Sequence, residues 1–169
     1  GVATNNAYSN NSKLNIDIIS SKVVTKEANG DSTAVLINIS GATLNIKENS
    51  IIEGQRQTLI VRAGIATVEK SEINFGNSFK PYGTGADSYY IGTEKDWADG
   101  NRITEGAIVV GNKTSSAYAG LAKLTMVGGS INAVSGKAIV TTVASDENHS
   151  VDVVIGKDSP TTIACGAGA

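Results

Sequence analysis

Residues 41–76 read GATLNIKENSIIEGQRQTLIVRAGIATVEKSEINFG, and this stretch contains one pattern twice. Five positions of the first copy recur in the second at a single constant offset: Leu44, Ile46, Asn49, Ile51 and Gly54 become Ala66, Val68, Ser71, Ile73 and Gly76. In each copy a short alternation of apolar and polar residues leads to a small polar residue, and a glycine closes the copy. Period-2 alternation predicts β-strands, and a repeat of roughly 22 residues predicts the stacked rungs of a solenoid.

One such unit cannot bury its apolar face alone, but it can bury that face against a copy of itself. We therefore expect the apolar residues of each copy to point inward and to stack on their equivalents in the next rung. The residues expected to point inward are Leu44, Ile46, Ile51, Val68 and Ile73.

Weaker copies of the pattern lie on both sides of this stretch. Ile16 and Ile18 precede it with the spacing of Leu44 and Ile46, and Leu124 and Met126 follow it with the same spacing. A last copy offers Val153 and Ile155, but the match fails at Pro160. A further apolar strand precedes the pattern at 34–40, 57–63, 106–112 and 137–143.

About five rungs of three short strands each are typical of a parallel β-helix, and the usual chirality of parallel crossovers makes the predicted coil right-handed. The polar corner positions are Ser21, Asn49, Ser71, Gly129 and Asp158, which are residue types that suit a tight turn. These corner residues either form a ladder along the stack or are ordinary turn residues without mutual contact.

Residues 77–105 interrupt the repeat, because the equivalent positions Leu59 and Ile108 lie about one rung further apart than the repeat requires. Insertions in repeat proteins map to loops on one face, which is often the binding face. The candidate binding residues in this loop are Tyr82, Tyr89, Tyr90, Trp97, Asp96, Asp99 and Arg102. Their aromatic rings suit stacking on a sugar, and their charged groups suit hydrogen bonds to its hydroxyls. The alternative is that the aromatic residues pack back on the coil as a small satellite core.

The composition fits one domain over residues 1–169, with 40% apolar residues and a net charge of −2 without blocks of either sign. This charge pattern argues against a nucleic-acid partner, and no apolar run is long enough to predict membrane insertion. The first and last residues suggest a fragment of a longer chain or a subunit of a larger assembly. Cys165 is expected to be a small buried hydrophobe, and His149 is expected at a solvated corner.

No metal site, cofactor or catalytic residue is predicted. Glu94, Asp96 and Asp99 do not have the spacing of an EF-hand loop. Glycoside hydrolysis requires two carboxylates that face one another, whereas the acidic residues of the predicted strands are scattered over different rungs. They are Asp17, Glu48, Glu69, Glu72 and Asp152.

The segments LAKLTMVGGSINAVSGKAIVTT (121–142) and ATLNIKENSIIEG (42–54) resemble rungs of bacterial extracellular β-helix proteins, especially the passenger domains of autotransporter adhesins. This resemblance implies export to the cell surface or medium, a rigid stalk-like body, and binding by loops or by one face. It carries no catalytic motif.

We therefore expect a non-enzymatic adhesive or structural module that recognises a cell-surface or host glycan or protein through the inserted loop. Two alternatives stay open. The first is a carbohydrate-active β-helix enzyme, such as a polysaccharide lyase or a hydrolase relative. The second is a filament subunit that associates end to end with copies of itself.

Overall fold

The computed structural model describes residues 2–3, 13–25, 33–54, 57–75, 106–112, 119–133, 137–143 and 147–166. Within these ranges every regular element is a β-strand. The described residues therefore contain no helix that is long and apolar enough to cross a membrane. The strands are β1 (Val2–Ala3), β2 (Leu14–Ile19), β3 (Lys22–Val24), β4 (Val35–Lys47), β5 (Ile51–Gly54), β6 (Leu59–Glu69), β7 (Glu72–Phe75), β8 (Gly106–Asn112), β9 (Gly120–Val127), β10 (Ser130–Ala133), β11 (Lys137–Val143), β12 (His149–Ile155) and β13 (Thr162–Cys165).

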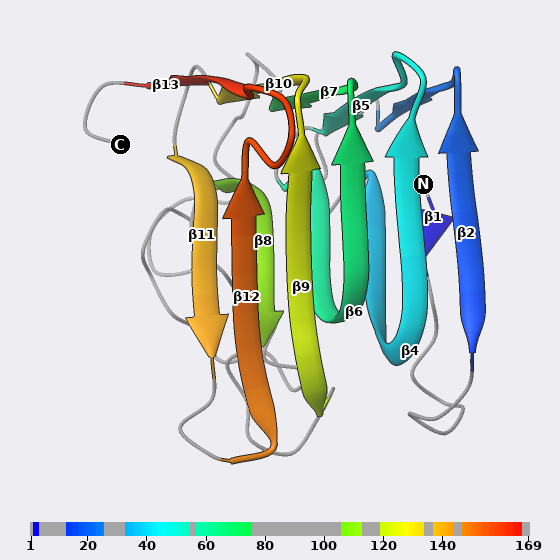
Figure 1. Cartoon of the computed structure of the whole chain (residues 1–169), viewed down its shortest axis with the longest axis vertical. Helices are drawn as coiled ribbons and strands as arrows, with labels where there is room; N and C mark the ends of the chain where they lie inside the picture. Colours follow the sequence, from blue (N-terminus) through cyan, green and yellow to red (C-terminus); the bar gives the residue numbers. More distant parts are fainter. Residues whose placement is uncertain are drawn as a thin grey trace, which may run out of the picture.

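The strands pair in three columns, and every pair among the described strands is parallel. The first column runs β1–β4–β6–β8–β11, the second β2–β4–β6–β9–β12 and the third β3–β5–β7–β10–β13. The long strands β4 and β6 belong to two columns, because each bends back on itself at the bottom of the view in Figure 1. One segment from each column makes a level, and the described strands make five levels in chain order.

The predicted all-β architecture of parallel strands is confirmed, whereas the closed right-handed coil stays a prediction. The four apolar strands predicted at 34–40, 57–63, 106–112 and 137–143 coincide with the first column. Leu59 pairs with Ile108, as their assignment to equivalent positions predicts. In β4 and β6 the first two predicted strands are joined into one continuous bent strand.

The core is built from side chains that lie over one another in successive levels. In the second column, Ile46 pairs with Val68 and Val68 with Met126, and all three are fully buried. In the third column, Ile52, Ile73 and Ile131 are paired and buried in the same way. Complete burial of one such side chain contributes about 1.5–3 kcal/mol, so these stacks are the main source of stability.

The inward assignment of Leu44, Ile46, Val68 and Ile73 is confirmed, but that of Ile51 is wrong. Ile52 pairs with Ile73, while the half-buried Ile51 pairs with Glu72 on the outer face. The corner 48–50 between β4 and β5 is one residue longer than the corner 70–71 between β6 and β7. The repeat offset between these two levels is therefore one residue shorter in the third column than in the second.

A serine ladder joins the first three corners, with Ser50 in the place expected for Asn49. The Ser21 amide donates to Ser50 Oγ at 3.1 Å, and the Ser50 amide donates to Ser71 Oγ at 3.2 Å. Each of these corners is therefore tied to the next one by hydrogen bonds as well as by the apolar stack beside it.

Different residues continue this row in the last two levels. Gly129 takes the place of Ser71 in level four, because the residue that follows it, Ser130, begins β10. In level five this place belongs to Thr161, and not to the predicted Asp158. Thr161 Oγ1 donates to the Gly128 carbonyl at 3.2 Å, so a hydroxyl again links two corners.

Gly129→Ala tests how closely these corners pack. Gly129 has φ +76°, and an added Cβ would lie 2.2 Å from the Ser71 carbonyl oxygen. Gly156 has φ +74°, but an added Cβ would find its nearest atom at 3.7 Å. Both variants incur the left-handed backbone cost of roughly 1–2 kcal/mol. We expect only Gly129→Ala to lose much more than that in urea unfolding, and equal losses would contradict the close corner packing.

Ile52→Thr and Ile51→Thr form a matched pair that tests the register of the third column. Ile52→Thr removes a buried methyl group and buries a hydroxyl, so it should cost about 2–4 kcal/mol. Ile51→Thr changes an outward side chain on the same strand and should cost less than about 0.5 kcal/mol. The urea midpoints followed by circular dichroism measure both. A larger loss for the Ile51 variant would mean that Ile51, and not Ile52, faces the core, as a uniform repeat offset requires.

Candidate functional site

The predicted binding residues of the inserted loop lie outside the described residues. These are Tyr82, Tyr89, Tyr90, Trp97, Asp96, Asp99 and Arg102. The described flanks show which strands precede and follow the insertion in the chain. It follows β7, which ends at the buried Phe75 in level three, and it precedes β8, which begins at Gly106 in level four.

The described part of the chain offers a second candidate surface, on the outer face of the third column. Side chains alternate across a strand, so residues next to the buried Ile52, Ile73 and Ile131 point outward. We call this row the polar strip. It consists of Lys22, Glu53, Glu72, Asn74, Ser130 and Asn132.

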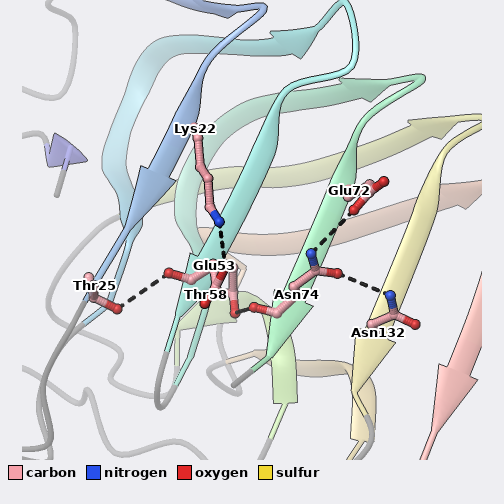
Figure 2. Close-up of polar contacts among 7 residues, drawn as sticks. All are labelled: Lys22, Thr25, Glu53, Thr58, Glu72, Asn74 and Asn132. Carbon is pink, nitrogen blue, oxygen red and sulfur yellow. Dashed lines mark hydrogen bonds and ion pairs between the residues drawn. The ribbon is translucent and has the colours of Figure 1, made fainter. Parts of the chain in front are cut away.

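Contacts between neighbouring side chains hold the polar strip in place (Figure 2). Lys22 Nζ lies 3.3 Å from Glu53 Oε2, which joins level one to level two. Asn74 Nδ2 donates to Glu72 Oε2 at 3.3 Å, and Asn132 Nδ2 donates to Asn74 Oδ1 at 3.1 Å. The paired amides of Asn74 and Asn132 therefore link levels three and four, which are the two levels that flank the inserted loop.

Residues near the strip also secure the backbone of these strands. Thr58 Oγ1 donates to the Asn74 carbonyl at 2.9 Å (Figure 2). Thr25 donates to the Glu53 carbonyl with its amide at 3.0 Å and with its hydroxyl at 3.5 Å. The buried Thr58 begins the chain's return to the first column just before β6. The strip is thus a row of amides and carboxylates on a firmly paired sheet.

The outer face of the second column carries a different set of groups. Asn45 Nδ2 donates to Asp17 Oδ1 at 2.9 Å, and Lys123 forms an ion pair with Asp152. Three exposed apolar side chains, Ile19, Ile65 and Leu121, lie on this outer face. A partly exposed ion pair is worth about 0–1 kcal/mol, so this face contributes little to stability through its charges.

The chemistry of the polar strip is hydrogen bonding. Glu53 and Glu72 already contact Lys22 and Asn74, respectively. Among the described residues, no three His, Cys, Asp or Glu side chains lie close enough together to hold a metal ion. The strip therefore presents fixed amide and carboxylate groups that suit sugar hydroxyls or the backbone of a partner protein.

Two residues singled out in the sequence have other environments than expected. His149 is buried, not solvated, because it is the first residue of β12 and pairs with Gly120. Cys165 is exposed, not buried. Its pairing with the buried Ala133 places it in an inward row, but it lies in level five, at the outer edge of the described stack.

The sequence does contain a signal for the polar strip. In the register of the third column, Glu53 aligns with Asn74, and Asn74 aligns with Asn132. A uniform repeat offset hides only the place of Glu53 in this row, because it shifts β5 by one residue and so exchanges the two faces of that strand.

Comparison of the chain with family models, with curated proteins and with solved structures gave no match.

Proposed function

We propose that this chain is a non-enzymatic adhesive or structural module of the right-handed parallel β-helix type, exposed on a bacterial surface or secreted. The observation that carries the proposal is the arrangement of its outward polar groups. On the described strands these groups lie in rows across successive levels, whereas a catalytic centre gathers its groups around one reacting atom.

The order of the strands supports a closed coil. The chain visits the first, second and third columns in the same order at each of the five levels. Every return to the first column is a crossover between parallel strands, and such crossovers are right-handed in about 98% of known cases. A coil of this kind makes a stiff body whose length grows with the number of levels.

The proposed recognition element is the inserted loop together with the part of the polar strip beside it. The inserted segment follows Phe75 in the sequence, and Phe75 is the neighbour of Asn74 in β7. A glycan bound by the aromatic rings of the loop would present hydroxyls to acceptors and donors. Asp96, Asp99 and Arg102 supply such groups in the loop, and Asn74 and Asn132 supply them on the sheet. The aromatic residues are Tyr82, Tyr89, Tyr90 and Trp97.

The proposal is tested by binding of the purified chain to arrays of glycans and of surface proteins. One variant replaces residues 79–103 by a short Gly/Ser linker, and a second carries Asn74→Ala with Asn132→Ala. Asn45→Ala is the matched control, because Asn45 makes the same kind of contact between levels on the second column. We expect loss of binding in the first variant, at least a several-fold loss in the second, and no change in the control.

Three outcomes separate the alternatives. Binding that survives both changes would contradict the assigned recognition element. Release of reducing sugars or unsaturated products from polysaccharides would contradict the non-enzymatic assignment. Absence of any binding, with all variants folded, would contradict the adhesive role and leave the structural one.

A further inference from the structure

The apolar columns that form the core are covered in the middle of the stack and less completely covered in the two end levels. Met126 and Ile131 in level four are fully buried, whereas their partners in level five, Ile155 and Ile163, are 47% and 41% exposed. At the other end Leu14 is 38% exposed, although its partner Ala42 is buried. Level five therefore presents large exposed apolar side chains that a further level would cover. In level one Leu14 is exposed, Ile16 and Val23 are partly buried, and Ile18 is only 6% exposed.

We define two end faces by these residues. The level-five face consists of Val151, Val153, Ile155, Ile163 and Cys165. The level-one face consists of Leu14, Ile16, Ile18, Val23 and Thr25.

We infer that the level-five face of one copy binds the level-one face of a second copy, so that the chain associates head to tail. This inference does not depend on the proposed recognition of a glycan or protein. It rests on the register of the columns. When this register is continued from level five of one copy into level one of the next, apolar side chains again meet apolar side chains.

The register specifies the partners across this interface. Ile18 pairs with Ile46, and the column continues through Val68 and Met126 to Ile155. In a second copy stacked as the next level, Ile18 therefore packs on Ile155. Each such contact joins two apolar side chains, as the contacts between levels within one copy do. The same continuation places Ile16 on Val153 and Val23 on Ile163.

The backbone of the end levels has the matching hydrogen-bonding pattern. The amide that begins a third-column strand donates to the level before it: Ile51 to the Ser21 carbonyl at 2.9 Å, and Thr162 to the Gly129 carbonyl at 3.0 Å. The equivalent amide in level one is that of Lys22, which pairs with Ile51. Across the interface, the Lys22 amide of the second copy therefore donates to the carbonyl of the residue before Thr162.

Charges on the outer face do not oppose this contact. Asp152 is paired with Lys123 of its own copy, and the continued register places it beside the uncharged Asn15 of the second copy. Asp17 comes to lie beside the apolar Val154. Natural sheet edges often carry charges that oppose pairing, and here no like charges face each other along β12 and β2.

The two end faces are different surfaces, so the contact is heterologous. A heterologous contact that does not close into a ring produces an open linear assembly. The expected product is a filament whose length increases with protein concentration.

Sedimentation velocity and electron microscopy of the chain over a wide concentration range test this inference. Ile155→Asp and Ile163→Asp place a charge in the level-five face, and both should fold, because these side chains are exposed in a single copy. Ile65→Asp is the matched control, since Ile65 is 39% exposed on the outer face of the second column. We expect linear oligomers from the unmodified chain and the control, and monomers from both end-face variants.

The inference would be overturned by a monomeric unmodified chain at all concentrations, or by end-face variants that associate as well as the control.

A disulfide cross-link between copies tests the register of the interface. Cys165 is the chain's single cysteine, and the continued register places it beside Thr25 of the next copy. Paired strands lie about 4.8 Å apart, which is within the Cα range of a disulfide.

Thr25→Cys should therefore give a series of covalent multimers on oxidation, resolved on a non-reducing gel. Thr43→Cys is the control, because Thr43 lies in level two and away from both end faces. Equal cross-linking of the two variants would contradict the proposed register.

Discussion

Packing of each level on the next is the constraint on which the whole structure depends. A single level is too thin to enclose its own apolar side chains, so it buries them against the levels beside it. Ile46, Val68 and Met126 have a level on either side and are fully buried, while Ile155 in level five is nearly half exposed. Stability is therefore a property of neighbouring levels and not of any single one.

Corner length controls which side chains meet in the third column. The strands of the first column, the position of the insertion and the pairing of Leu44 with Ala66 can be predicted from the sequence, because they follow from local periodicity. The replacement of Ile51 by Ile52 in the core cannot, because it depends on the longer corner at 48–50. Two consecutive left-handed residues, Glu48 and Asn49, accommodate the additional residue.

The environments of other residues depend both on this register and on the position of each level in the stack. A uniform repeat already aligns Asn74 with Asn132, because levels three and four have the same offset in the second and third columns, but it misplaces Glu53. Cys165 is inward by strand spacing but exposed by its place in level five, which no local pattern indicates. The seven loop residues proposed for binding follow from composition and from the break in the repeat. Both signals locate an insertion without defining its contacts.

Recognition and assembly use separate surfaces of this molecule in the two proposals. The polar strip belongs to the outer face of the third column, whereas the end faces lie across the stack. A filament would therefore repeat the recognition element along its length, once for each copy. Such repetition raises overall avidity without requiring a new contact.

Amide hydrogen exchange in the Ile163→Asp variant tests most directly whether stacked levels hold the fold together, because this variant is expected to stay monomeric. We predict the slowest exchange in the parts of β4, β6 and β9 that form the second column, and faster exchange in β2 and β12 at the two ends. Equal protection in all five levels, or greater protection in β2 and β12, would contradict the dependence of each level on its neighbours.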